Sequence, residues 1–406
     1  MLPSNMINII NVFILFFLII VAVFVLSYFA KYIIRHNVNI FGGSSIQDDD
    51  EIWIENTYND AEKALIKETC KLKPRKFERS DLYIDLDEKL PISYREFENS
   101  DAFVTRVHQG QRKLFLCELY FLTEFGHLSD TIVYAGAAPG HHTVLLSELF
   151  PKHKFHLYDP RDVFDERFKN NDMVNTYVQF FTDEDAKNWD GKDVLFMSDI
   201  RISVNDYDAR ELQISADMDM QMNWVKNMNP IKSLLKFRLP WDRSNVDYLN
   251  GDLIYQQYPS RYSSESRLIV DKDYKMINYN GKAYDDAMYK HNIIDREWMR
   301  FKVDKPFYNN SWDNACEEFI INNYCDKMKS VSDNKIYTFN YVYNKIKMGK
   351  IDPYNLKDKN MCKDREEIYN INIKKHESRL LDLRKKKENK VNTYDEIKKI
   401  NKEKNK

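Results

Sequence analysis

The stretch that most constrains the fold runs from residue 131 to residue 142 and reads Thr-Ile-Val-Tyr-Ala-Gly-Ala-Ala-Pro-Gly-His-His. An apolar run typical of a strand leads directly into small residues and two glycines, Gly136 and Gly140. An amphipathic stretch with leucines at helical spacing follows over 142–150. This order predicts a strand, a tight glycine turn and a helix whose first backbone amides face a ligand.

A second apolar run over 154–158 leads into an acid, Asp159. An acid at the tip of the second strand of a Rossmann-like half is suited to the hydroxyl groups of a ribose. The two strands together favour a site for an adenosine-type cofactor. The Gly-x-x-x-Gly spacing alone fits an ordinary buried turn equally well.

Strand and helix patterns alternate along the central part of the chain. Strands are predicted at 131–135, 154–158, 175–181, 194–198, 231–237 and 267–270. Helices are predicted at 109–125, 142–150, 183–189, 209–228 and 316–328. This alternation predicts an α/β fold with a doubly wound central sheet, whose ligands bind outside the carboxyl ends of the strands.

The N-terminal part, 1–36, reads as a membrane anchor. Residues 7–28 are apolar almost throughout and are long enough to cross about 30 Å of hydrocarbon as a helix. Lys31 and Arg35 follow this segment and no basic residue precedes it, so the positive-inside rule predicts that the rest of the chain faces the cytosol. A buried core helix and a misassigned translation start are the alternatives.

Three further units are predicted from the composition. A linker with a short helix at its end covers 37–72, the main domain covers 73–330, and a basic extension covers 331–406. The last fifty residues of this extension hold 17 Lys and Arg against 10 Asp and Glu, which fits a solvated tail or an electrostatic contact with RNA. Five scattered cysteines without a CxxC pair indicate a reducing compartment and no disulfide or metal framework.

Four polar residues occur where α/β enzymes carry catalytic groups. Lys113 begins the helix before the glycine turn, and Asp199 ends a central strand. Lys236 lies inside an apolar strand, and Glu265 precedes the last predicted strand. Taken singly, each residue fits a local ion pair with a nearby arginine. Taken together, their order resembles the Lys-Asp-Lys-Glu tetrad of Rossmann-like RNA 2′-O-methyltransferases.

The chemistry of this reaction explains the residue types. A ribose hydroxyl must lose its proton as its oxygen attacks a methyl group. A lysine accepts that proton only if its pKa falls from ~10.4 toward neutrality, which burial, a second lysine and a sulfonium charge all favour. We therefore expect Lys236 to be the general base and Lys113 the neighbouring charge. Asp199 and Glu265 would orient the lysine and the ribose.

Residues from about 90 to 325 resemble the poxvirus family of mRNA cap 2′-O-methyltransferases, which also serve as regulatory subunits of the viral poly(A) polymerase. The stretches that carry the resemblance are 110–122, 133–142, 158–161, 198–201, 229–230, 233–241 and 262–268. The resemblance implies a Rossmann-like, S-adenosylmethionine-dependent methyltransferase whose catalytic tetrad is Lys113, Asp199, Lys236 and Glu265. This chemistry requires no metal.

The resemblance also implies two sets of binding residues. The cofactor set is Gln111, Tyr134, Gly136, Pro139, Gly140, His142, Asp159, Arg161, Phe181, Thr182 and Arg201. The set that would hold the methylated guanine of the cap is Tyr94, Arg238, Trp241 and Asp285. A cationic base stacks on aromatic faces, and carboxylates accept hydrogen bonds from its N–H edge. Trp241 stands where the family has phenylalanine, and a core or surface aromatic is the alternative reading.

We therefore expect a cap-specific mRNA (nucleoside-2′-O-)-methyltransferase of a large DNA virus, acting in the host cytoplasm or the virion. Its expected partners are capped mRNA, the poly(A) polymerase catalytic subunit and a membrane reached through residues 7–28, with the catalytic domain facing the cytosol. Two other functions stay open. One is an FtsJ-like methyltransferase that acts on ribosomal RNA, and the other is a non-catalytic RNA-binding polymerase subunit.

Overall fold

The computed structural model describes residues 58–95, 110–201, 207–241, 243–260, 263–304, 307, 310–329 and 338–347. The predicted membrane segment at 7–28, within the predicted unit 1–36, lies outside these residues, as does the basic end of the chain beyond residue 347. Within the described ranges, no helix combines the length and the apolar character needed to cross a membrane.

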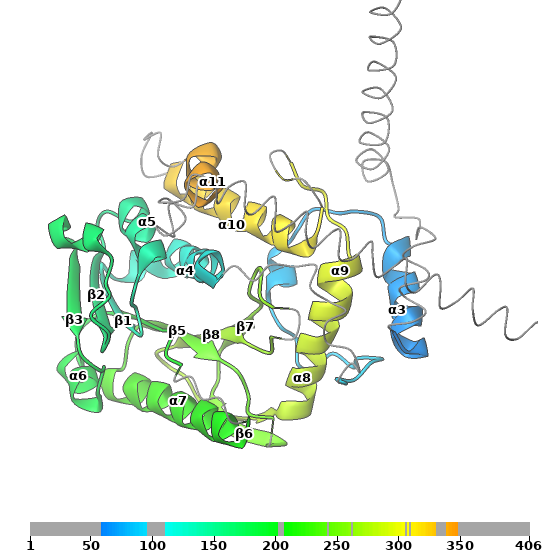
Figure 1. Ribbon diagram of the computed structural model, residues 1–406, viewed down its shortest axis with the longest axis horizontal. Coiled ribbons are helices and arrows are strands. Elements are labelled where there is room, and N and C mark those ends of the chain that lie inside the picture. The colour runs from blue at the N-terminus through cyan, green and yellow to red at the C-terminus, as the bar shows by residue number, and fades with distance from the viewer. Residues whose placement is uncertain are drawn as a thin grey trace, which may run out of the picture.

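A seven-stranded sheet with the order β3-β2-β1-β4-β5-β8-β7 lies at the centre of the molecule (Figure 1). Its strands are β1 (Thr131–Ala135), β2 (Lys154–Asp159), β3 (Val174–Val178), β4 (Leu195–Ser198), β5 (Lys232–Phe237), β7 (Asp252–Ile254) and β8 (Ser266–Asp271). Strands β1 to β5 pair in parallel, whereas β8 runs antiparallel to β5 and β7. The strand order reverses between β1 and β4, so the predicted α/β fold with a doubly wound sheet is confirmed.

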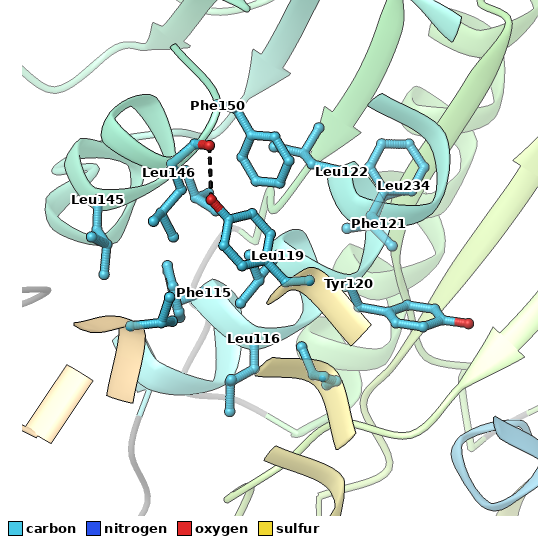
Figure 2. Close-up of a cluster of buried hydrophobic side chains, with 14 of the residues drawn as sticks. Phe115, Leu116, Leu119, Tyr120, Phe121, Leu122, Leu145, Leu146, Phe150 and Leu234 are labelled. Carbon is cyan, nitrogen blue, oxygen red and sulfur yellow. Dashed lines mark hydrogen bonds between the residues drawn. The ribbon is translucent and has the colours of Figure 1, made fainter. Parts of the chain in front are cut away.

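Helices cover both faces of this sheet (Figure 1). One face carries α4 (Gly110–Phe125), α5 (His141–Leu149) and α10 (Trp312–Lys329), and the other carries α6 (Asp183–Asn188) and α7 (Tyr207–Met228). Figure 2 shows part of the hydrophobic core between the sheet and α4, α5 and α10. There, Phe115, Leu119 and Leu122 of α4 lie close to Leu146 and Phe150.

Strand β1 shows why the central strands have continuous apolar sequences. Ile132 and Tyr134 face the core under α4 and α5, and Val133 and Ala135 face the core under α7. Successive side chains of a strand point to opposite faces, so a parallel strand covered on both faces needs apolar residues at every position.

The predicted strand at 175–181 is shorter in the structure and ends at Val178. Phe181 turns into the core beside Tyr158, with 4.9 Å between the ring centroids. Thr182 is the N-cap of α6, because its hydroxyl accepts from the Asp185 amide at 3.2 Å and its own amide donates to the Asp185 carboxylate at 2.9 Å. This capping box ends the extended stretch before the position that the pattern predicted.

Several elements have no counterpart among the predicted ones. They are a ribbon of β6 (Asn245–Leu249) and β9 (Met276–Asn280), the helix α8 (Gly281–Lys290), a π-helical turn (His291–Asp295), and α9 (Arg296–Trp298). Most residues of the ribbon are exposed, and Asn and Asp interrupt its apolar residues, so its apolar pattern is weak.

The folded part extends beyond the predicted domain limits 73–330 at both ends. Helix α3 (Asp60–Lys71) lies inside the predicted linker 37–72, and α11 (Phe339–Lys347) lies inside the predicted extension 331–406. Ile66 of α3 packs in a cluster with Ile293, and Val342 of α11 joins the large core beneath α10. Each helix is amphipathic and buries its apolar face against the rest of the folded part.

Candidate functional site

The four tetrad residues meet at the carboxyl ends of β4 and β5. Asp199 directly follows β4, Lys236 lies in β5, and Lys113 lies in the first turn of α4. Glu265 directly precedes β8, which runs antiparallel to β5 and therefore begins where β5 ends. The sheet topology thus brings together residues that are far apart in the sequence.

The distances show a closed network of ion pairs. Lys236 Nζ lies 3.1 Å from Asp199 Oδ1 and 3.3 Å from Glu265 Oε2. Lys113 Nζ donates to Glu265 Oε1 at 2.7 Å. The two lysines are each only 8% exposed, so the carboxylates and not solvent fix the positions of their ammonium groups.

Arg267 is a further charged member of this cluster, which the sequence analysis considered only as a nearby arginine in a local ion pair. It pairs with Lys236 across the β5–β8 ladder and is 2% exposed. Its Nη2 atom lies 2.6 Å from Asp199 Oδ1 and 3.7 Å from Glu265 Oε1. The available signal was an arginine inside an apolar strand, two residues after Glu265 and so on the same face.

The positive charges of the cluster lower the pKa values of its two carboxyl groups. Burial alone would raise the pKa of Asp199, but Lys236 and Arg267 outweigh burial and hold this pKa below its usual value. Burial opposes ionisation of Glu265 too, and Lys113, Lys236 and Arg267 hold its pKa well below the usual value. The cluster therefore contains two carboxylates facing two lysines and a guanidinium.

The glycine turn after β1 lies against the loop after β4. Gly136 has φ of +81°, and a Cβ there would lie 3.0 Å from the Asp199 backbone carbon. Gly140 has φ of +72° and is the N-cap of α5. Both positions lie in the left-handed region that favours glycine. Pro139 lies between them and follows a cis peptide bond.

Four of the side chains around the turn form a buried hydrogen-bond network. His142 Nδ1 lies 2.9 Å from Gln111 Oε1, and His142 Nε2 lies 3.1 Å from Glu118 Oε1. The Tyr134 hydroxyl donates to the same Glu118 oxygen at 2.6 Å. The network fixes three predicted cofactor residues through Glu118, which the sequence analysis missed although it is a carboxylate within an apolar helix face.

The predicted ribose acid, Asp159, lies at the end of β2 and is 3% exposed. In this structure its carboxylate accepts from Arg161 Nε at 2.8 Å, from Arg161 Nη2 at 2.9 Å and from the Ala138 amide at 3.2 Å. The Arg161 side chain is 60% exposed, so a ligand hydroxyl can take its place without unpacking the core.

Three other predicted cofactor residues lie at the same edge of the sheet with their side chains engaged by the protein. Phe181 packs in the core, and Thr182 caps α6. Arg201 Nη1 lies 3.3 Å from Oδ2 of Asp217 in α7.

The predicted cap residues also lie together. The rings of Tyr94 and Trp241 are 5.7 Å apart between centroids and are tilted by 40°. The Arg238 guanidinium carbon lies 4.7 Å from the Trp241 ring centroid. Glu211 of α7 holds this arrangement, because it accepts from Arg238 at 2.6 Å and from the Trp241 amide at 2.9 Å.

Asp285 completes this group, since it accepts a hydrogen bond from the Trp241 side chain. Its pKa is raised to about 7. Burial is the main cause, and Asp286 and Glu211 add to it, while Arg238 and Trp241 oppose it. Near neutral pH, Asp285 therefore exists both as an acceptor-only carboxylate and as a protonated acid.

This raised pKa predicts a change in stability with pH. The unfolded chain releases the Asp285 proton near pH ~3.9, but the folded chain keeps it until the pH is much higher, so wild-type stability falls as the pH rises between these limits. The free energy of unfolding of Asp285→Asn, relative to that of the wild type, should therefore increase from about pH 4 upward. This difference should become constant above about pH 7. Urea denaturation across this range measures the difference, and a constant difference would contradict the assignment.

Among the described residues, no group of three or more His, Cys, Asp and Glu side chains is placed to hold a metal ion.

Comparison with known proteins adds independent observations. Residues 81–349 match the family model described as "Poly A polymerase regulatory subunit". The proteins named "Cap-specific mRNA (nucleoside-2′-O-)-methyltransferase" from two Myxoma virus strains, Lausanne and Uriarra, are each 28% identical over 253 residues, which is 57% of this chain and 72% of theirs. A solved structure of bluetongue virus VP4, described as a multifunctional RNA-capping production line, gives a TM-score of 0.39 at 11% identity. The match covers 59% of this chain and only 37% of that one.

Proposed function

Because the chain belongs to the poly A polymerase regulatory subunit family, we propose that it is an S-adenosylmethionine-dependent methyltransferase that acts on mRNA caps. Its reaction would place a methyl group on the ribose 2′-hydroxyl of the first transcribed nucleotide. The Myxoma virus relatives carry the name of this activity, which supports the proposal and a site of action in the host cytoplasm or the virion.

The observation that carries the proposal is the buried tetrad. Lys236 is held between Asp199 and Glu265 and, together with Lys113 and Arg267, gives the cluster one more positive than negative charge. Release of one proton from Lys236 would leave the cluster neutral, so a lysine here is suited to accept a proton from the ribose hydroxyl. The carboxylates would keep its Nζ atom in the line of approach of that hydroxyl.

The residues around the glycine turn fit S-adenosylmethionine. The turn has no room for a Cβ at Gly136, and the Ser198 hydroxyl at the end of the neighbouring strand β4 is buried with no protein partner within the described part of the chain. Gln111 and His142 would lie near the methionine part, and Asp159 would bind the ribose once Arg161 moves away. The bound cofactor would supply a methyl group carried on a positively charged sulfur.

The experiment that tests the proposal is a methyl-transfer assay on RNA of one sequence with and without a 7-methylguanosine cap. We expect transfer to the capped RNA only, on the 2′-hydroxyl of the first nucleotide. Equal transfer to both RNAs would favour an FtsJ-like enzyme of ribosomal RNA. Binding of RNA without transfer to either substrate would favour a non-catalytic subunit.

Trp241→Ala should weaken binding of 7-methylguanosine triphosphate by about ten- to hundredfold, since stacking on an aromatic ring contributes roughly 1–3 kcal/mol per base. Isothermal titration with this nucleotide and with unmethylated GTP measures the effect. The control is Tyr341→Ala, which removes an aromatic ring from α11. If Trp241→Ala binds the methylated nucleotide as tightly as the control does, Trp241 has no part in the cap site.

The family description favours a second role, stimulation of a poly(A) polymerase catalytic subunit. This role would need a binding surface and not the tetrad. A Lys236→Ala chain should therefore stimulate polyadenylation as well as the wild type does, in an assay with the catalytic subunit of the same virus. Loss of both activities together would argue that one site serves both.

A further inference from the structure

Glu62 of α3 is a buried carboxylate that the proposed reaction does not use. Its side chain has no exposed surface. It accepts from Arg95 Nε at 2.9 Å and Arg95 Nη2 at 2.7 Å, and from the Tyr289 hydroxyl at 2.7 Å. One carboxylate thus joins three segments that are far apart in the sequence, namely α3, the segment 92–95, and the end of α8.

Helix α3 lies before the first residue that the family model matches, yet it is packed against the domain. The matched region begins at residue 81, whereas α3 ends at Lys71. Ile66 of α3 packs in a buried cluster with Ile92 and Ile293. The helix lies beside α9 (Figure 1). Helix α3 is therefore a packed element of the structure that lies outside the region matched by the family model.

Tyr94, which precedes Arg95 in the chain, carries one of the two aromatic rings of the proposed cap site, and Trp241 carries the other. The Tyr94 amide donates to Asp286 of α8 at 2.8 Å. Its ring packs edge-on against Tyr289, with 5.6 Å between the centroids. Glu62 therefore binds Arg95, which follows Tyr94 in the chain, and Tyr289, whose ring packs against the Tyr94 ring.

The separation of the two rings means that at least one of them must shift when a base enters. A base stacked between two rings needs roughly 7 Å between them, twice a contact distance of about 3.5 Å. The centroids of Tyr94 and Trp241 are 5.7 Å apart. The contacts of Tyr94 and Arg95 hold this part of the backbone, so the Tyr94 ring can rotate while the residue stays in place. A mobile tyrosine would have to become ordered when the base binds, and this ordering would cost part of the binding free energy.

We propose that Glu62 is a positioning residue for the cap, which acts through Arg95 and Tyr289 to hold Tyr94 opposite Trp241. The inference rests on the proposed cap methyltransferase function and extends it to a helix outside the family-matched region. Glu62 does not touch the cap or the reacting atoms. Its loss should affect binding of the methylated guanine and leave the chemical step intact.

Two variants test this inference in the full-length protein. Glu62→Gln removes the charge that binds Arg95, and Tyr289→Phe removes only the hydroxyl that donates to Glu62. The matched control is Glu68→Gln, which breaks an exposed pair with Lys71 in the same helix. We expect KM for capped RNA to rise about tenfold in Glu62→Gln and less in Tyr289→Phe, with kcat and KM for S-adenosylmethionine unchanged.

The outcomes separate this inference from the proposed function. If the wild type methylates capped RNA and both variants keep its KM, the role of Glu62 is refuted and the function stands. A parallel loss of kcat and of S-adenosylmethionine binding would indicate a general structural role and would also refute it. If the wild type transfers no methyl group, the proposed function fails, and titration with 7-methylguanosine triphosphate still decides whether Glu62→Gln weakens cap binding.

Discussion

Replacing Lys236 with alanine should lower the rate of methyl transfer to capped RNA by about 10²- to 10⁴-fold, the usual contribution of a positioned general base. The physical reason is the place of its Nζ atom, 3.1 Å from Asp199 and 3.3 Å from Glu265, at the carboxyl end of β5 where the ligand of a doubly wound sheet binds. If Lys236 is the base, as proposed, the variant lacks the amine that would accept the proton of the ribose hydroxyl.

The decisive comparison is with Lys236→Arg, which keeps the positive charge but cannot release a proton near neutral pH. We expect this variant to be as inactive as Lys236→Ala if proton transfer is what matters. The surface control is Lys226→Ala, an exposed lysine of α7. Single-turnover rates with saturating cofactor and capped RNA are the measurement. Full activity in Lys236→Ala would show that another group is the base.

The sequence predicted those parts of the fold whose pattern is long and fully buried. The strands at 131–135, 154–158, 194–198 and 231–237 match β1, β2, β4 and β5 within one residue at either end. The β6–β9 ribbon and α8 were missed because short, half-exposed elements depend on their tertiary neighbours for stability. The family was predicted from ordered motifs, and the match over 81–349 confirms it.

The site was harder to predict where its residues act through distant partners. The tetrad followed from an ordered resemblance, but nothing local in the sequence indicates that Arg267 reaches Asp199 or that Glu62 reaches Tyr289. Such contacts link residues 68 and 227 positions apart, so only the fold reveals them.

Arg267→Met should lower the free energy of unfolding by about 3–5 kcal/mol, which is the usual cost of removing one partner from a buried ion pair. Arg267 is 2% exposed and donates to Asp199 at 2.6 Å. Methionine fills much of the same volume, so the loss reports the missing ion pair with Asp199 and not a cavity. The control is Arg79→Met, whose side chain is 55% exposed beside Glu124 and whose loss should cost less than about 1 kcal/mol.

The pH dependence of the difference in unfolding free energy between the wild type and Arg267→Met distinguishes the loss of the ion pair from poorer packing. In the wild type the pKa values of Asp199 and Glu265 lie below their usual values, so their contribution to stability is present above about pH 4 and is lost as the pH falls further. In Arg267→Met these carboxyl groups lose a counter-charge and take up protons at higher pH. The difference in unfolding free energy should therefore narrow as the pH is lowered, down to the range below about pH 4 in which the wild-type carboxyl groups take up their protons, as measured by urea denaturation. A difference that stays constant with pH would mean that Arg267 stabilises the fold by packing alone, and the charge balance proposed for Lys236 would then lose its support.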